Sequence, residues 1–308
     1  NIQYRSSPHP KKILLPPLLS LKMNHPSMRG FKTFEHFLET FTPSGSVKKI
    51  LITGSSGRLG NELFHGMKRV YGAENILCVD LKNDRNIPDE RFERLNVLDG
   101  KRFEDIVKNF QPDTLLHLAT VLSGKGEQNP HLCLKINNKG TQNAFEIATK
   151  YNLRLFYASS VSTFGRDTPK KNVADLTIQR PNSISGITQA YNELLGEWYN
   201  LKQGTDFRCL RYPSIISPTK VSYSTAMCIN DIYYQALTYK KYTNYLAPDQ
   251  LLPVIYMDDL LTGTIQFLEA PDTRLYKRTY NIQSCSLTPR DQAEAIVHKI
   301  PDFKVDYQ

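Results

Sequence analysis

A glycine-rich turn between a short apolar run and an amphipathic stretch constrains this chain more than any other feature. Residues 50–52 are Ile, Leu and Ile, and residues 53–60 have the sequence T-G-S-S-G-R-L-G. Apolar residues then recur at helical spacing as far as Val70. This order predicts a buried strand, a tight turn and a helix whose free amides bind phosphate groups. We expect dinucleotide contacts from Gly54, Gly57, Arg58, Leu59 and Gly60.

An acidic residue ends the next apolar run, where it would meet the ribose of a bound dinucleotide. Asp80 closes residues 75–80 and lies 20 positions after Gly60. A carboxylate there accepts hydrogen bonds from both ribose hydroxyls and repels a 2′-phosphate, which selects NAD over NADP. The alternative is an aspartate at a strand end that caps the following turn.

Apolar runs alternate with amphipathic stretches through residue 212, which predicts a parallel sheet with helices on both faces. The expected fold class is α/β, a Rossmann-like doubly wound parallel sheet with a smaller C-terminal substrate-binding lobe. We expect a basic leader over residues 1–46, a NAD-binding Rossmann domain over 47–212 and the lobe over 213–308. Expected strands cover residues 50–52, 75–80, 92–97, 114–119, 154–160 and 207–212, and expected helices cover 101–110, 129–151, 185–202, 228–239 and 258–269.

The positive charge of the chain is concentrated at its start. Residues 1–34 contain six Lys or Arg and no Asp or Glu, so they hold +6 of the net charge of +9. Basic and acidic residues nearly balance in the rest of the chain, which argues against a nucleic-acid-binding surface. A basic segment without acids is typical of a mitochondrial transit peptide and predicts the matrix as the location. The alternatives are a disordered tail or upstream sequence read through, and then a cytoplasmic protein. Because the first residue is Asn1, we expect a fragment or a processed product.

Neither a membrane span nor a metal site is expected from the residue pattern. No apolar run approaches the roughly 20 residues that a membrane-spanning helix needs. The five cysteines are odd in number and far apart, without the spacing of metal ligands. They are typical of free thiols in a reducing compartment.

Several stretches resemble one family. The turn motif, the strand D-x-x-x-H-L-A at residues 113–119 and N-x-x-G-T at 137–141 are similar to the extended short-chain dehydrogenase/reductase superfamily. The stretches L-S-G-K-G-E at 122–127 and S-L-T-P at 286–289 resemble NAD-dependent L-threonine 3-dehydrogenases within it. The resemblance implies a homodimer in which the helix that carries Ser185 pairs across the axis. It also implies cofactor contacts from Asn96, Val97, Leu118, Ala119, Asn137 and Gln189, and substrate contacts from Ser123, Ser160 and Thr225.

The resemblance implies a reaction whose acid–base residues are missing here. The family oxidises the 3-hydroxyl of L-threonine to the ketone of 2-amino-3-oxobutanoate and transfers the hydride to NAD. In the superfamily a Tyr removes the proton, a Lys four residues later lowers the Tyr pKa, and a Ser orients the hydroxyl. Ser160 matches the orienting Ser, but Ser185 and Gln189 occupy the Tyr and Lys positions. Losing a general base slows a reaction roughly 100- to 10,000-fold, so we expect an inactive or very weak protein.

Further departures leave alternatives open. Residues 221–228 lack the glycine-rich loop of the family, and the family continues for several tens of residues past the equivalent of Tyr307. The alternatives are an enzyme recorded with errors or as a fragment, a NAD-binding pseudoenzyme or partner-binding protein, and a sugar-nucleotide epimerase/dehydratase. We expect His117 to be a hydrogen-bonded core histidine, and Tyr191 to lie in the core rather than to replace the base.

Overall fold

A seven-stranded parallel sheet forms the centre of the computed structural model, which describes residues 33–85, 87–218 and 227–308. The strand order is β3-β2-β1-β4-β5-β6-β10, which is the doubly wound order expected for a dinucleotide-binding sheet. The strands are β1 (Ile50–Thr53), β2 (Ile76–Asp80), β3 (Phe92–Arg94), β4 (Thr114–His117), β5 (Arg154–Ser160), β6 (Phe207–Tyr212) and β10 (Thr279–Asn281). The Rossmann-like α/β fold is therefore confirmed.

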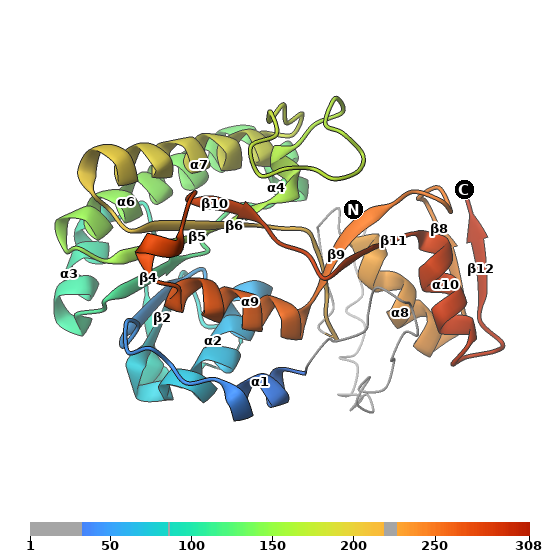
Figure 1. The fold of residues 1–308 in the computed structure, drawn as a ribbon, viewed down its shortest axis with the longest axis horizontal. Coiled ribbons are helices and arrows are strands. Elements are labelled where there is room, and N and C mark those ends of the chain that lie inside the picture. The colour runs from blue at the N-terminus through green and yellow to red at the C-terminus, as the bar shows by residue number, and fades with distance from the viewer. Residues whose placement is uncertain (1–32, 86, 219–226) are drawn as a thin grey trace, which may run out of the picture.

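Helices cover both faces of this sheet (Figure 1). One face carries α1 (Phe34–Thr40), α2 (Arg58–Tyr71) and α9 (Met257–Glu269), and the other carries α3 (Gly100–Phe110), α6 (Thr141–Lys150) and α7 (Ile184–Gln203). Successive residues of β1 point to opposite faces, so Ile50 and Ile52 join one apolar core and Leu51 joins the other. This two-sided burial explains the uninterrupted apolar run in the sequence.

The chain after residue 213 enters the lobe, returns to the central sheet with α9 and β10, and then completes the lobe, which differs from the expected boundary at residue 213. Helix α9 packs on α2, and β10 pairs in parallel with β6. The lobe proper contains α8 (Met227–Tyr239), α10 (Pro289–Val297) and the paired strands β8 (Lys241–Asn244) and β12 (Lys304–Tyr307). Strands β7 (Ser214–Ile216), β9 (Leu252–Tyr256) and β11 (Cys285–Leu287) form a three-stranded sheet. The short apolar runs after residue 213 did not show which strand rejoins the larger sheet.

The expected leader overlaps a folded helix. Helix α1 starts at the cap residue Thr33, whose side chain accepts a hydrogen bond from His36 N. Phe34 and Phe37 are buried against the core of α2 and α9. Glu269 accepts hydrogen bonds from Ser44 N and from Tyr71 Oη. Residues 33–46 therefore belong to the folded unit, and the expected boundary at residue 46 was too late.

The remaining differences concern helix limits. The helix expected over residues 129–151 consists of α5 (Pro130–Leu134), a π-helical turn η4 (Lys135–Gly140) and α6. A π turn inserts an extra residue into the helical ladder and is frequent at functional sites. Helix α4 (Ser123–Gln128) precedes it. Short 3₁₀ turns lie at η2 (Ala73–Asn75), η3 (Asp89–Arg91), η5 (Val161–Thr163) and η6 (Asp272–Arg274).

Candidate active site

The glycine turn after β1 is held against the end of β4 by a close backbone contact. Gly54 has a φ of 70°, and a Cβ atom added to it would lie 2.6 Å from the backbone nitrogen of Ala119. A Cβ atom on Gly60 would lie 2.5 Å from the carbonyl oxygen of Gly54. Side chains are therefore excluded at both positions by the packing of the turn itself. Leu118 and Ala119, both expected near the cofactor, donate their amides to Thr53 Oγ1 at 3.2 and 3.4 Å.

The start of α2 has the properties of an anion site. Its cap residue Gly57 is exposed and supplies no side-chain cap, so the first amides of the helix are available to a ligand. A Cβ atom on Gly57 would meet a single neighbour, Gly54 O at 3.1 Å, and would otherwise project into open space. The buried Nη1 atom of Arg58 has no hydrogen-bond partner, which is a donor that an anionic group satisfies. These residues fit the pyrophosphate of a dinucleotide, which supplies the hydride acceptor when it is bound.

Asp80 lies at the end of β2 and is bound to the same turn. Its Oδ2 atom accepts a hydrogen bond from Ser56 N at 2.9 Å, and its Oδ1 atom accepts one from Leu81 N at 2.7 Å. The capping interpretation of this aspartate is therefore observed. Each carboxylate oxygen can accept a second hydrogen bond, so a ribose contact remains compatible with this geometry and stays a prediction.

Asn96 and Val97, which were expected to contact the adenine side of the cofactor, lie in the segment after β3. Asn96 forms a turn in which its Oδ1 atom accepts from Leu98 N at 3.1 Å. Val97 is buried, and its carbonyl oxygen accepts from Asn143 Nδ2 at 2.8 Å. Both residues follow β3, the strand that pairs with β2 and its last residue Asp80. This position agrees with the expected adenine side, and their cofactor contacts stay predictions.

Two of the residues expected to be catalytic, Ser160 and Gln189, are linked through a third residue at the end of β5. Ser160 Oγ accepts a hydrogen bond from Ser162 N at 3.1 Å, and Ser162 Oγ donates to Gln189 Oε1 at 2.5 Å. Ser160 and Gln189 were expected in one site, whereas Ser162, which lies on the short turn η5, was not expected there. Two serines separated by one residue at a strand end were the available signal. The Gln189 side chain is thus held by its carbonyl oxygen, where a Lys would present an ammonium.

Ser185 lies in the first turn of α7 and is 3% exposed. This end of the helix is capped by Ser183 Oγ, which accepts from Gly186 N at 3.1 Å, and by Glu127, which accepts from Ile184 N at 2.8 Å. Tyr191 is 48% exposed, so its expected place in the core was wrong. The apolar face of α7 that carries it points to solvent rather than toward the sheet. Tyr191 therefore does not bring a phenol to the site.

A buried polar network fixes α7 against the strand that ends at His117. Asn137 Oδ1 accepts from Val121 N at 2.7 Å, and Asn137 Nδ2 donates to Thr188 Oγ1 at 2.9 Å. Asn192 Nδ2 donates to Asn137 O at 2.9 Å. Asn137 thus positions the catalytic helix, and its expected cofactor contact stays a prediction.

His117 is a satisfied core histidine, as expected. Its Nδ1 atom is 2.9 Å from Thr53 Oγ1, and its Nε2 atom is 3.1 Å from Thr141 Oγ1. Burial lowers the pKa of this imidazole to about 4, because a charged ring would lose its hydration there. The ring therefore joins β1, β4 and α6 in its neutral form.

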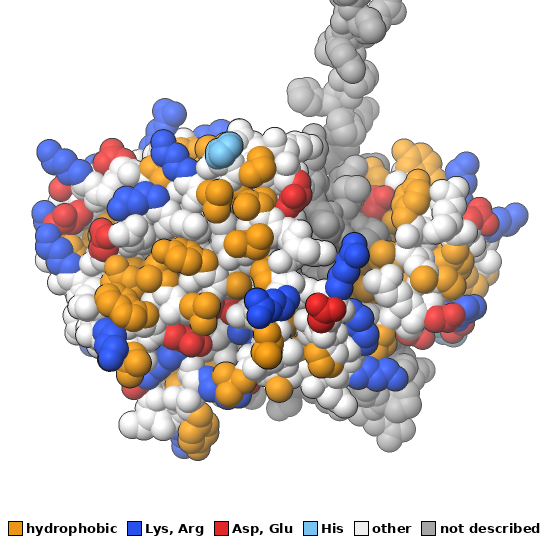
Figure 2. Space-filling model, turned by 90° about the horizontal axis from the view of Figure 1, so that it is seen from above, with side chains coloured by type: hydrophobic (Ala, Val, Ile, Leu, Met, Phe, Trp, Pro, Cys, Tyr) orange, Lys and Arg blue, Asp and Glu red, His pale blue; other side chains and the backbone are white. Residues whose placement is uncertain are grey.

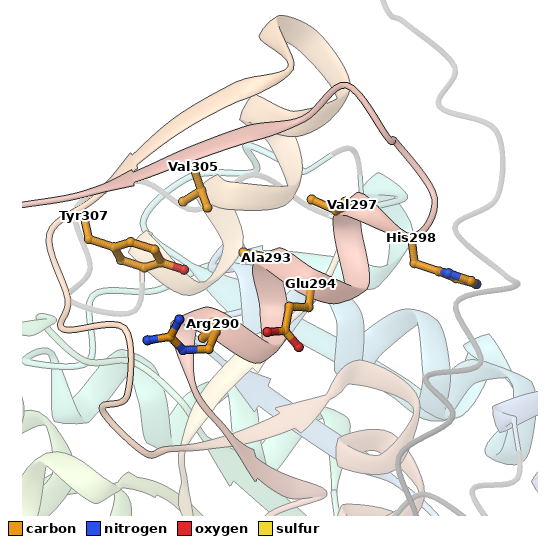
Figure 3. A pocket seen from close by; sticks show the side chains of 7 residues that line it. All are labelled: Arg290, Ala293, Glu294, Val297, His298, Val305 and Tyr307. Atoms are coloured by element: carbon orange, nitrogen blue, oxygen red, sulfur yellow. The ribbon is translucent and has the colours of Figure 1, made fainter.

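The expected substrate contacts other than Ser160 are Ser123 and Thr225. Ser123 is half-buried at the start of α4, and Thr225 lies outside the described residues. Within the described part of the chain, no cluster of His, Cys, Asp or Glu has the arrangement of a metal site, and no helix has the length and apolar character of a membrane span. A groove of about 500 Å³ lies between α10 and β12, and it is lined by Arg290, Glu294, Val305 and Tyr307 among others (Figure 3). It contains none of the expected site residues.

Known proteins resemble this chain over most of its length. A model of the NAD dependent epimerase/dehydratase family matches residues 50–282. An uncharacterized epimerase/dehydratase of Staphylococcus saprophyticus is 37% identical over 266 residues, which are 85% of this chain and 83% of the relative. The solved L-threonine dehydrogenase from Phytophthora infestans is 39% identical, with a TM-score of 0.82 and 85% of each chain covered. The enzyme from Clostridium difficile is 36% identical, with a TM-score of 0.82 and coverage of 85% of this chain and 84% of that one.

Proposed function

The chain belongs to the NAD dependent epimerase/dehydratase family, and on that premise we propose that it is a NAD-binding relative of L-threonine 3-dehydrogenase with little or no dehydrogenase activity. NAD binding follows from the family and from the turn at Gly57. The threonine assignment is supported by the solved threonine dehydrogenases at 36 and 39% identity. The loss of activity is supported by the residues on α7.

One observation carries the proposal, namely the two side chains at the expected catalytic positions of α7. The Gln189 side chain is hydrogen-bonded to Ser162, and the residue one helical turn before Gln189 is Ser185. Oxidation of a secondary alcohol requires a group that accepts the hydroxyl proton as hydride leaves the same carbon. Ser160 can orient a substrate hydroxyl from the end of β5. The Ser185 hydroxyl is too weak a base when neutral and several ångströms shorter than a phenol. Gln189 is uncharged, so it cannot stabilise a phenolate or alkoxide beside it.

The first experiment separates binding from turnover in the purified chain. We expect calorimetry to show NAD binding, and absorbance at the NADH band to show no threonine-dependent increase. Turnover at the ordinary dehydrogenase rate of about 1 to 1,000 per second would contradict the loss of activity. A folded sample that fails to bind NAD would contradict the cofactor assignment.

A second experiment tests the two positions directly with a matched control. The double variant Ser185→Tyr/Gln189→Lys restores the phenol and the ammonium, while Ser185→Phe/Gln189→Lys supplies the same bulk without the hydroxyl. We expect threonine-dependent NADH formation by the tyrosine variant to exceed that of its phenylalanine control by roughly 100- to 10,000-fold. Equal rates in the two variants would show that position 185 does not carry the base.

The proposal includes a homodimer formed through α7. Its exposed face carries an apolar stripe at helical spacing, and side chains of this kind gather on the surface above the sheet (Figure 2). The stripe consists of Ile187, Tyr191, Leu194, Trp198 and Leu201, which are 47 to 76% exposed. Sedimentation at micromolar concentration should give a dimer for the unmodified chain and a monomer for Leu194→Glu/Trp198→Glu. A monomeric unmodified chain would refute the proposed homodimer.

A further inference from the structure

A long segment without helix or strand joins η5 to α7. It covers residues 164–183 and projects from the body of the fold beside the start of α7 (Figure 1). Loops of this length without secondary structure of their own are uncommon in compact domains, and ordered examples are usually functional. None of the residues expected in the cofactor or substrate site lies in this loop.

The inner side of the loop is fixed to the central sheet. Asp175 Oδ1 accepts a hydrogen bond from Asn281 N at 2.8 Å, and Asp175 Oδ2 forms an ion pair with Lys277 Nζ at 3.2 Å. Asn281 Nδ2 donates to Val173 O at 3.0 Å, and Arg211 Nη1 donates to Asp175 O at 2.7 Å. These bonds hold the middle of the loop against β6 and β10, so the side chains on its outer side are presented in a fixed arrangement.

Two large apolar side chains lie on the outer side of the loop. Leu176 is 76% exposed, and Ile178 is 74% exposed. Their neighbours Asp175, Thr177 and Gln179 are partly buried. The loop is therefore folded so that polar side chains face the protein and aliphatic side chains face water. Removal of this aliphatic surface from water is favourable.

Exposed cations flank the two apolar residues on both sides in the sequence. They are Arg166, Lys170, Lys171 and Arg180. Lys170 Nζ donates to the carbonyl oxygen of Arg166 at 3.0 Å rather than to a carboxylate. The loop also contains two acids, but the Asp175 carboxylate is already paired with a Lys from outside the loop. The outer side of the loop therefore combines aliphatic side chains with an excess of positive charge.

An anionic lipid surface fits both kinds of side chain. Its acyl boundary takes aliphatic side chains, and its headgroups attract Lys and Arg, whose long side chains place the charge at the level of the phosphates. A stable protein interface buries about 800 Å² on each side, which a projecting loop with two apolar side chains does not supply. No described helix has the character of a membrane span, so the contact is with the membrane surface.

We propose that the loop over residues 164–183 binds anionic membrane surfaces, with Leu176 and Ile178 entering the headgroup layer and the four cations of the loop contacting lipid phosphates. The inference goes beyond the proposed function and does not rest on it, because the loop contains neither the cofactor turn nor an expected catalytic position.

Co-sedimentation of the full chain with lipid vesicles tests the inference. We expect binding to vesicles of equimolar phosphatidylcholine and phosphatidylglycerol, weak binding to phosphatidylcholine alone, and a loss of binding as the salt concentration rises. Leu176→Ser/Ile178→Ser should weaken binding at least about tenfold. Lys170→Gln/Lys171→Gln should weaken it about 10- to 30-fold, since each cation beside an anionic surface contributes about fivefold. The basic residues 1–34 are the same in every variant, so their charge does not account for these differences.

Two variants of the C-terminal lobe are matched controls. Tyr245→Ser removes an apolar side chain that is 72% exposed. Lys299→Gln/Lys304→Gln removes two exposed cations and so changes the net charge by the same amount as the double Lys variant of the loop. Both controls should bind anionic vesicles within about twofold of the unmodified chain.

Every other outcome counts against the inference. Failure of the folded chain to bind anionic vesicles would overturn it, as would equal binding by the loop variants and the controls. Binding that depends on the cations but not on Leu176 and Ile178 would indicate a polyanion such as an acidic protein instead of a membrane. Conversion of a dimer to a monomer by Leu176→Ser/Ile178→Ser would assign these side chains to a contact between copies of the chain. NAD binding should be unchanged in every variant, so its absence would affect the proposed function alone.

Discussion

The buried ion pair between Arg211 and Glu193 offers the sharpest test of how the catalytic half of this fold is held together. Both side chains are at most 5% exposed. Glu193 accepts from Arg211 Nη2 at 2.8 Å and from Gln179 Nε2 at 2.7 Å, and it also accepts from Ser159 Oγ. Arg211 Nη1 donates to Asp175 O at 2.7 Å. The pair therefore joins β6 to α7 and to the segment that precedes α7.

Arg211→Met should lower the free energy of unfolding by about 3–5 kcal/mol, because it leaves a buried carboxylate without its cation. This is a large share of the roughly 5–15 kcal/mol that stabilises an ordinary domain. The double variant Arg211→Met/Glu193→Leu removes both charges and should recover most of the loss. Urea unfolding of the two single variants and the double variant gives the coupling energy directly.

Arg102→Met supplies the matched control, because Arg102 and Glu93 form an ion pair with side chains 45 and 34% exposed. Water screens such a pair, so its loss should cost less than about 1 kcal/mol. Arg211→Met with a loss no larger than this control would refute the reasoning, as would additive losses in the double variant. NAD affinity should be unchanged in every variant that remains folded, since the turn at Gly57 makes no contact with this pair.

Three further predictions concern other parts of the chain. The pKa of His117 is about 4 in the folded protein and 6.5 in the unfolded chain, because burial disfavours the charged ring. The free energy of unfolding therefore has its full contribution from neutral His117 above pH 6.5. This contribution is lost as the pH falls from 6.5 through 4, by about 3 kcal/mol in total. The urea midpoint should fall across this range, and His117→Gln should remove that part of the fall. Gly54→Ala should lower the free energy of unfolding by about 1–3 kcal/mol, because the added Cβ would meet the Ala119 backbone and φ is 70° at this position. Gly57→Ala should instead weaken NAD binding with little change in the melting temperature. Residues 1–34 fused to a fluorescent protein should direct it to the mitochondrial matrix, and a diffuse cytoplasmic signal would contradict the transit-peptide interpretation.

The sequence was sufficient for the inner strands β1, β2, β4, β5 and β6 because they are largely buried on both faces. A run such as residues 50–52 then has no competing assignment once a glycine turn and an amphipathic helix follow it. The expected strands before residue 213 all appear, with shifts of at most three residues at their ends. The glycine positions were equally predictable, since Gly60 is required by a backbone contact within the turn and Gly54 by a backbone contact with Ala119 after β4.

The errors occurred where a residue's environment depends on segments distant in the sequence. Phe34 and Phe37 lie beside a basic stretch, and their burial comes from α2 and α9, which no local pattern indicates. Tyr191 lies on an apolar helix face, and periodicity cannot tell a face that meets the sheet from one that meets solvent or another subunit. The only sequence signal for Ser162 was its spacing from Ser160 at a strand end, because its contact with Gln189 forms only when η5 folds against α7.

The structure also explains how the two halves of the site can diverge. Helix α7 is positioned by Gly186 against Ser162 O, by Gly196 against the Phe207 ring, and by the hydrogen bonds of Thr188 and Asn192. Ser185 and Gln189 are buried as well, and the Gln189 side chain accepts a hydrogen bond from Ser162 Oγ on η5. The cofactor turn is held separately, by the backbone of Gly54 against Ala119. The contacts of Gly186, Gly196, Thr188 and Asn192 do not involve the side chains at positions 185 and 189, so an exchange at these two positions leaves those contacts and the glycine turn in place. The proposed loss of dehydrogenase activity is therefore compatible with an intact fold and an intact cofactor turn.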